Sequence, residues 1–302
     1  MNTIEVTDMR KFAAFDIGGT DIKHGIVLED GDIIERSSMA TRASEGKSQL
    51  LRRVAEQVEL YKRNHSLAGI AISSAGVVNV DEGKIMHTTN VIKDYDNTPV
   101  KTMLEESTGL KTEINNDVNC FALCEARIGA AADVSDALVM TVGTGIGGGI
   151  LINNELIYGA KYAAGEWGHM EIPGGMYETV ASVSALVKDA RHQMGPHIKN
   201  GLDVFNAYDG GDMVAKECVE KFYTNLAIGI ANLISIFNPG RIVIGGGISE
   251  RATFIDELTR HLEKHAKKEF FESVSLKSAR FNNLSGMKGA MFHFLEMEQK
   301  RQ

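Results

Sequence analysis

Two glycine-rich turns in the sequence carry residues that suit the binding of phosphate groups. The first is Asp16-Ile17-Gly18-Gly19-Thr20, and the second is Gly143-Thr144-Gly145 within the run 138–152. Glycine lets the backbone approach a ligand closely, so that amide N–H groups can converge on an anion. Apolar residues flank both turns, at 11–15 and 22–28 around the first and at 138–142 and 150–152 around the second. The pattern predicts two phosphate-binding turns, each between two strands.

Asp16 gives the first turn a carboxylate at the end of a strand. Beside glycine amides and the Thr20 hydroxyl, this carboxylate suits Mg²⁺ held through water, together with phosphate oxygens. Lys23 could add a point charge, or it could be a solvated lysine on a strand. Two strand–turn–strand units about half a chain apart indicate a duplicated domain.

Two other glycine patterns do not fit the sites they suggest. Gly143, Gly145 and Gly148 match the glycine spacing of the dinucleotide-binding fingerprint. Glu166 lies near the sequence separation at which the ribose-binding acid of that fingerprint would be expected. That site needs a helix at its third glycine, whereas residues 150–152 form an apolar strand pattern. Gly46-Lys47-Ser48 resembles the end of a Walker A loop, but the position five before Gly46 is a threonine.

Asp117 stands where a strand over residues 111–117 meets a helix predicted for residues 118–131. As a helix N-cap it would contribute about 1 kcal/mol. As a general base, its carboxylate would accept a sugar hydroxyl proton while that oxygen attacks phosphorus. Asn116 would orient hydroxyl groups, and the two roles of Asp117 are compatible.

Three further clusters suit a polyol and a nucleotide. Glu166, His169 and Glu178 could present acceptors and an imidazole to one sugar. The small residues that end in Gly76 follow a strand at 67–72, and they either leave room for a ligand or serve tight packing. A third glycine turn follows a strand at 241–244 and could lie against a purine, with Ser249 predicted to cap the next helix. Its residues are Gly245, Gly246 and Gly247.

Composition restricts the class of protein. A chain of 302 residues with 43% hydrophobic and 24% charged residues predicts a globular protein of two domains. A net charge of −8 argues against nucleic acid as a partner. Three cysteines argue against a disulfide framework and for a reduced compartment, and Cys120 and Cys124 are interpreted as small buried side chains.

Targeting and membrane segments are not expected. Residues 1–10 are polar with acidic side chains, so no signal peptide is predicted. The longest apolar run, residues 226–237, is too short to cross a bilayer and predicts a buried part of a helix over residues 212–237. The expected location is the cytoplasm, without membrane attachment.

These motifs, in this order, resemble the ROK family of sugar kinases and sugar-sensing repressors, in the hexokinase/actin-like ATPase superfamily. The resemblance extends from Phe12 to about Leu295. Five motifs carry it, namely Asp16 to Thr20, Ala75-Gly76, Asn116-Asp117-Val118-Asn119, Thr141 to Gly149 with Gly165 to His169, and Asn238 to Gly247.

The resemblance implies an α/β fold of two ribonuclease H-like domains with a cleft between them, which closes on sugar. The expected small domain is residues 1–120 with a C-terminal helix at about 287–302, and the large nucleotide-binding and dimerisation domain is 121–286. ATP phosphates and Mg²⁺ are implied for Asp16, Gly18, Gly19, Thr20, Lys23, Gly143, Thr144 and Gly145, and adenosine for Gly245, Gly246 and Gly247. Asp117 is implied as the catalytic base, and the implied sugar-binding residues are Gly76, Asn116, Asp117, Glu166, His169 and Glu178.

The sequence departs from the family pattern at three places. No cysteine-rich loop follows His169, so no structural zinc is predicted. Ser73-Ser74-Ala75-Gly76 replaces a proline-glycine turn, and zinc-less members with this turn resemble β-glucoside and N-acetylmannosamine kinases. Trp167 replaces a smaller aliphatic residue, and it either lines the pocket or packs beside it.

The expected function is therefore an ATP-dependent kinase acting on the 6-hydroxyl of a hexose of the glucose or β-glucoside type. The alternatives are an N-acetylmannosamine kinase and a non-catalytic sugar-sensing ROK regulator. Only fifteen residues precede Asp16, which argues against the DNA-binding domain of such a regulator. The family also suggests a homodimer.

Overall fold

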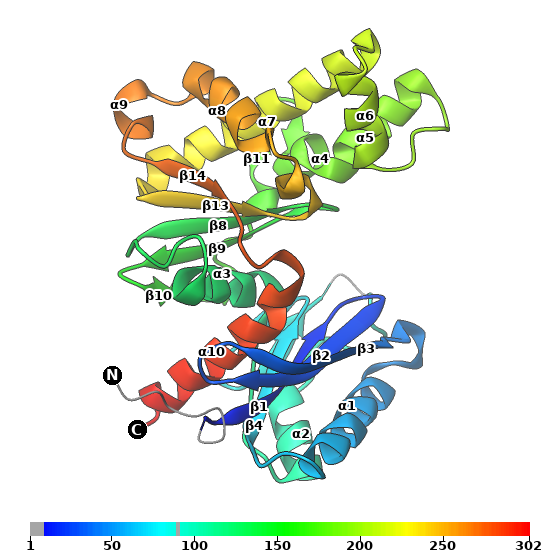
Figure 1. Cartoon of the computed structure of the whole chain (residues 1–302), viewed down its shortest axis with the longest axis vertical. Coiled ribbons are helices and arrows are strands. Elements are labelled where there is room, and N and C mark those ends of the chain that lie inside the picture. Colours follow the sequence, from blue (N-terminus) through cyan, green and yellow to red (C-terminus); the bar gives the residue numbers. More distant parts are fainter. Residues whose placement is uncertain (1–8, 89–90) are drawn as a thin grey trace. The chain divides into compact units, whose positions relative to one another are not determined.

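The computed structural model describes residues 9–88 and 91–302, which form two compact units (Figure 1). Unit 1 contains the described residues up to Ile128, with Tyr158–Ala163 and Asn283–Gln302, and unit 2 contains Gly129–Ile157 and Ala164–Asn282. Helices α3 (Asp117–Ile128) and α10 (Ser285–Lys300) each stay whole within unit 1, whereas the boundaries predicted at residues 120 and 287 fall inside them. The expectation of no signal peptide concerns residues 1–10, of which residues 1–8 lie outside the described part.

The main sheet of unit 1 has five strands in the order β3-β2-β1-β4-β7. Strands β1, β2 and β3 pair antiparallel, and β4 and β7 continue the sheet in parallel with β1. The strands are β1 (Lys11–Ile17), β2 (Asp21–Leu28), β3 (Ile33–Ala40), β4 (Leu67–Ser74) and β7 (Thr112–Asn116), and a separate pair is β5 (Val77–Asn79) and β6 (Lys84–His87).

Helices cover both faces of this sheet, because successive side chains of a strand point to opposite faces. Phe15 of β1 belongs to the core that includes apolar residues of α1 (Lys47–Lys62) and α2 (Val100–Thr108). Phe12 points to the other face, where its ring lies 5.0 Å from that of Phe294 in α10. Figure 1 shows α10 on the opposite side of the sheet from α1 and α2.

Unit 2 is built on a second five-stranded sheet, in the order β10-β9-β8-β13-β14. Its strands are β8 (Ala137–Val142), β9 (Ile146–Ile152), β10 (Glu155–Leu156), β13 (Arg241–Gly245) and β14 (Ser275–Ser278), and β11 (Glu171–Ile172) pairs with β12 (Gly175–Met176). Its helices, which lie on one side of this sheet in Figure 1, are α4 (Tyr177–Ala181), α5 (Val183–Met194), α6 (Gly201–Asp209), α7 (Met213–Phe237), α8 (Phe254–His265) and α9 (Lys268–Phe271).

The two sheets share one topology, which confirms the predicted duplication and the ribonuclease H-like fold. In each, three antiparallel strands are followed by two strands parallel to the first. The predicted helix at 212–237 is confirmed as α7. In the described part of the chain, no helix combines the length and apolar character needed to cross a membrane.

One capping prediction is wrong. Ser249 lies within a short 3₁₀ helix, Gly247–Glu250, and its hydroxyl donates to the carbonyl of Gly246 at 2.8 Å. Helix α8 begins later, at Phe254, after Thr253, which makes no side-chain capping hydrogen bond. The 3₁₀ turn therefore uses the serine locally and separates it from the helix that it was expected to cap.

Candidate active site

The predicted site residues fall into two sets, one in each unit. Unit 1 holds Asp16, Gly18, Gly19, Thr20, Lys23, Gly76, Asn116 and Asp117. Unit 2 holds Gly143, Thr144, Gly145, Glu166, His169, Glu178, Gly245, Gly246 and Gly247.

Asp16 is fixed by residues that are remote from it in sequence. It pairs with Ser73 in the register of β1 and β4, and Ser73 Oγ donates to Asp16 Oδ1 at 2.7 Å. Lys23 Nζ lies 3.8 Å from Asp16 Oδ2, so this lysine contributes charge next to the carboxylate as well as being partly exposed. Burial raises the pKa of the neighbouring Cys120 thiol well above its ordinary value, with a further contribution from the Asp16 charge. Cys120 and Cys124 are fully buried, which confirms their interpretation as small core residues.

The turn after Asp16 is closed by the Gly18 N–H, which donates to the carbonyl of Asp21 at 3.1 Å. Gly19 and Thr20 are exposed at its tip. Backbone amides and a hydroxyl at such a tip are available to phosphate oxygens, as the sequence pattern predicts.

The capping role that the sequence allowed for Asp117 is taken by Asn116. The Asn116 side-chain oxygen accepts the N–H groups of Val118 and Asn119, at 2.9 and 3.0 Å, so Asn116 is the cap of α3. Asp117 is the first helical residue, and its Oδ1 accepts from Asn116 Nδ2 at 2.9 Å. The same Nδ2 donates to the carbonyl of Gly76, also at 2.9 Å. Asn116 therefore ties the Asp117 carboxylate to the Gly76 turn.

The second glycine turn connects β8 and β9. Gly143 N–H donates to the carbonyl of Gly145 at 3.0 Å, and Thr144 is exposed between them. The N–H of Ser184, in the first turn of α5, donates to the carbonyl of Gly143 at 3.3 Å. Because the positive end of a helix dipole lies beside this turn, the turn is suited to hold an anion. No sequence pattern indicated this contribution of α5.

Trp167 packs against the glycine hairpin. A Cβ atom placed on Gly148 would lie 1.8 Å from its ring, and Trp167 Nε1 donates to the carbonyl of Gly147 at 3.2 Å. Only 5% of Trp167 is exposed. This resolves its open role, because the glycines of β9 make room for an indole.

Glu178 lies beside the phosphate turn. A Cβ atom added to Gly145 would be 2.6 Å from Glu178 Oε2, and one added to Gly168 would be 3.1 Å from the same oxygen. Glu166 and His169 flank Trp167 and Gly168, and both are exposed. The short 3₁₀ helix Trp167–His169 thus presents polar side chains at its ends, while its middle packs on the hairpin.

The third glycine turn is also close to the second. Gly246 has φ +96°, and a Cβ there would lie 2.4 Å from the carbonyl oxygen of Val142. Gly245 is buried at the end of β13. A Cβ atom added to Gly247 would have no neighbouring atom within 4 Å. Gly246 therefore lets the chain turn against β8, and Gly247 leaves open space.

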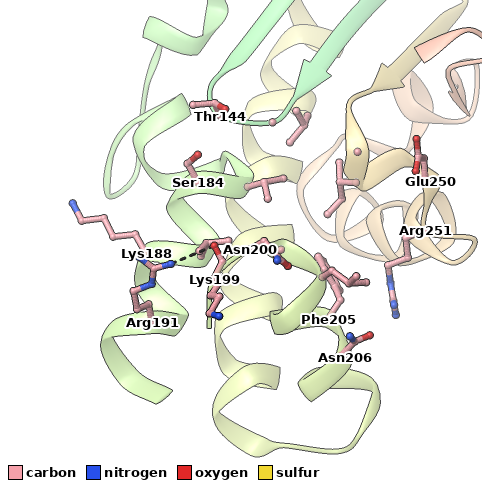
Figure 2. A pocket seen from close by; sticks show the side chains of 18 of the residues that line it. Thr144, Ser184, Lys188, Arg191, Lys199, Asn200, Phe205, Asn206, Glu250 and Arg251 are labelled. Carbon is pink, nitrogen blue, oxygen red and sulfur yellow. Dashed lines mark hydrogen bonds between the residues drawn. The ribbon is translucent and has the colours of Figure 1, made fainter. Parts of the chain in front are cut away.

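A pocket of about 1320 Å³ opens from these two turns within unit 2. In Figure 2, Thr144 and Ser184 lie at its upper end, with Arg191 and Lys199 on one side and Arg251 on the other. The volume exceeds the roughly 300–1,000 Å³ of common ligand pockets. The pocket has the size for a nucleotide and has cationic side chains on both sides.

The far wall of the pocket contains a network of charged side chains that no sequence pattern indicated. Arg251 makes two hydrogen bonds to the Asp209 carboxylate, at 2.7 and 2.8 Å, and two to the Glu257 carboxylate, at 2.9 and 3.2 Å. Its guanidinium lies 4.9 Å from the ring centre of Phe205. Hydrogen bonds to Asp209 and Glu257 raise the pKa of Arg251. Burial acts to raise the pKa of Glu257, but the hydrogen bonds from Arg251, Tyr223 and Thr253 and the Arg251 charge together lower it. No local pattern connects these three separated segments.

Known proteins resemble this chain over nearly its whole length. The ROK family model matches residues 12–296. A β-glucoside kinase of Listeria monocytogenes is 39% identical over 302 residues, covering 97% of this chain and 100% of that protein. A solved Listeria monocytogenes structure, provisionally assigned as an N-acetylmannosamine kinase, has a TM-score of 0.85 at 38% identity and covers 95% and 99% of the two chains. A Streptomyces griseus glucokinase, solved with glucose and AMPPNP, has a TM-score of 0.79 at 27% identity, covering 93% and 98%.

Proposed function

The chain belongs to the ROK family, and from this membership we propose that it is an ATP-dependent kinase for the 6-hydroxyl of a hexose. The observation that carries the proposal is the placement of Asp117. It is partly exposed at the start of α3, and Asn116 holds one of its carboxylate oxygens. A carboxylate fixed in this way can accept a proton from a bound hydroxyl group.

The reaction needs little covalent chemistry from the protein. Asp117 accepts the proton of the 6-hydroxyl, the sugar oxygen forms a bond to the γ-phosphorus, and the bond from that phosphorus to the β–γ bridging oxygen breaks. ADP leaves with the electron pair. Positioning of the two substrates and neutralisation of phosphate charge supply most of the rate enhancement.

The donor ATP is assigned to the pocket of unit 2. Gly143, Thr144 and Gly145 would bind phosphate oxygens, and Gly245, Gly246 and Gly247 would face adenosine. In unit 1, Gly18, Gly19, Thr20 and Lys23 would add phosphate contacts. The cationic side chains of Arg191 and Lys199 on the pocket wall favour an anionic ligand.

Asp16 fits the Mg²⁺ expected for such a donor. One carboxylate oxygen accepts from Ser73, while the nearest lysine nitrogen is 3.8 Å from the other oxygen, too far for a hydrogen bond. Among the described residues no cluster of three or more histidine, cysteine or acidic side chains could hold a metal. A single carboxylate is nevertheless typical for Mg²⁺, which retains water and binds substrate phosphates. Bound Mg²⁺ would neutralise phosphate charge, and we propose no zinc.

The sugar is assigned to Gly76, Asn116 and Asp117 of unit 1 and to Glu166, His169 and Glu178 of unit 2. Glu166 and His169 are exposed, so their polar groups are available to a ligand. Both N–H donors of the Asn116 side chain already have acceptors, so a sugar hydroxyl would share one of them. The main role of Asn116 is thus to orient Asp117.

The substrate class is proposed from the relatives. Beta-glucoside kinases match the chain over nearly its whole length, at 36–39% identity, which favours glucose or a β-glucoside. The structural neighbour provisionally assigned as an N-acetylmannosamine kinase makes that sugar the second candidate. A sensor without catalysis would not need the fixed Asp117 carboxylate.

We also propose that the protein is a homodimer and that it is located in the cytoplasm. The three cysteines are free and buried, which fits a reducing compartment.

A sugar panel tests the proposal. ADP release from ATP with Mg²⁺ is measured with glucose, cellobiose, gentiobiose, N-acetylmannosamine, N-acetylglucosamine, mannose and fructose. We expect turnover with glucose or a β-glucoside. Saturable sugar binding in calorimetry with no ADP release for any sugar would instead support the sensor alternative.

Gly145→Ala separates sugar binding from stability. The new methyl group would meet the end of the flexible Glu178 side chain, so we expect the carboxylate to move and unfolding free energy to change by less than about 1 kcal/mol. The KM for sugar should rise about tenfold, equivalent to about 1.4 kcal/mol. Gly143→Ala is the matched control, because no atom lies within 4 Å of the added methyl. Equal sugar KM values for the two variants would remove Glu178 from the sugar site.

A further inference from the structure

We propose that Ser73 is a positioning residue, which holds the Asp16 carboxylate in the orientation that supports Mg²⁺ at the donor nucleotide. The inference deepens the proposed function and rests on it, because it concerns the orientation of Asp16 when Mg²⁺ and nucleotide bind. Ser73 was considered from the sequence only as part of a small-residue turn, together with Ser74, Ala75 and Gly76.

The strand register places Ser73 beside Asp16. The two residues are direct partners of the parallel strands β4 and β1, so their side chains project from the same face of the sheet. Ser73 is fully buried, and its hydroxyl donates to Asp16 Oδ1 at 2.7 Å. A short hydrogen bond to a carboxylate is among the stronger kinds in proteins. The buried donor therefore selects one orientation of Asp16.

Helix α10 closes a second side of the carboxylate. A Cβ atom on Gly286 would lie 2.4 Å from Asp16 Cγ, 2.5 Å from Oδ1 and 2.7 Å from Oδ2. Only glycine leaves room for the carboxylate at this point, in the first turn of α10. Ser73 and Gly286 together restrict the Asp16 side chain, which is 20% exposed, while Lys23 approaches only to 3.8 Å.

Loss of the hydroxyl would have a defined consequence. Without the Ser73 donor, Asp16 Oδ1 loses a buried partner, and the carboxylate can rotate away from its present orientation. A single carboxylate that helps to bind Mg²⁺ depends on its orientation, because Mg²⁺ requires near-ideal octahedral geometry. The Mg²⁺ dependence of nucleotide binding should therefore change, while nucleotide binding without Mg²⁺ and sugar binding should not.

Ser73→Ala tests the inference, and Ser74→Ala is its matched control. Ser74 is the next residue of β4 and is equally buried, but its hydroxyl contacts the carbonyl of Ala75 and Tyr95 Oη, at 3.3 and 3.2 Å. Calorimetry measures ADP affinity as a function of Mg²⁺ concentration, and glucose or β-glucoside affinity in parallel. For Ser73→Ala we expect the Mg²⁺ midpoint to rise at least about fivefold. For Ser74→Ala it should stay within twofold.

Gly286→Ala provides a second test, since it pushes the carboxylate instead of removing its donor. Its Mg²⁺ midpoint should rise as well, and thermal unfolding of each variant verifies that the protein is folded. Midpoints for Ser73→Ala and Ser74→Ala that agree within twofold would overturn the inference. Absence of any Mg²⁺-dependent ADP binding by the unchanged protein would contradict the proposed function itself, and this inference with it.

Discussion

Replacing Asp117 with asparagine is expected to lower kcat by about 10²–10⁴-fold, because an amide cannot accept the proton of the sugar hydroxyl. Asparagine keeps the size of the side chain and an oxygen for the Val118 N–H, which Asp117 Oδ1 accepts at 2.9 Å. We therefore expect α3 to form normally and sugar affinity to stay within a few-fold. Initial rates of ADP release with saturating sugar and MgATP measure the effect.

Asp30→Asn is the control for this substitution. Asp30 is exposed in the turn between β2 and β3, and its Oδ1 also accepts a backbone N–H, from Asp32 at 2.9 Å. The same chemical change there should leave kcat unaltered. An Asp117→Asn variant with more than a tenth of the original kcat would show that Asp117 is a helix residue without a catalytic role.

Trp167→Ala is expected to lower the free energy of unfolding by about 3–5 kcal/mol. The indole is almost fully buried on Gly148 and donates to the Gly147 carbonyl, so its removal leaves a cavity beside the phosphate turn. The backbone that carries Glu166 and His169 on either side of Trp167 should shift, and the sugar KM should rise together with the loss of stability. Urea unfolding followed by far-UV circular dichroism measures the change.

Trp167→Phe is the matched variant, since it retains an aromatic ring and removes the indole N–H. We expect it to cost less than half as much as the alanine substitution. A decrease of less than about 1 kcal/mol in the free energy of unfolding of Trp167→Ala would contradict the view that the glycines of β9 make room for a stabilising indole. Because the chain has only this tryptophan, we expect sugar binding beside it to change the fluorescence of the unchanged protein.

The sequence was sufficient to predict those features that depend on local pattern. The apolar runs around Asp16 and Thr144 predicted strand–turn–strand units, and their repetition predicted the duplicated sheet. The helix predicted over residues 212–237 is confirmed as α7, and Asp212 directly before it is the cap, with its carboxylate accepting from the N–H groups of Val214 and Ala215 at 2.9 Å. These features need only neighbouring residues, so their signal is present in the sequence.

Features that depend on partners far along the chain were not predictable. Ser73 and Gly286 meet at Asp16 only because β1, β4 and α10 pack together. Tyr158 similarly reaches Asn115, whose Nδ2 donates to its hydroxyl at 2.9 Å, although residues 158–163 interrupt unit 2 in the sequence. The capping roles of Asn116 and Ser249 were not predictable either, although their partners are near in the sequence, because asparagine and serine fit several capping positions.

The most direct test of the central claim is identification of the product. The protein is incubated with ATP, Mg²⁺ and the sugar that supports the fastest ADP release, and the product is analysed by phosphorus–proton correlation NMR. We predict one sugar phosphate whose phosphorus couples to the protons of carbon 6 of a hexose ring. Phosphate on a different carbon, or ADP release without any sugar phosphate, would contradict the assignment of Asp117 as the base for the 6-hydroxyl.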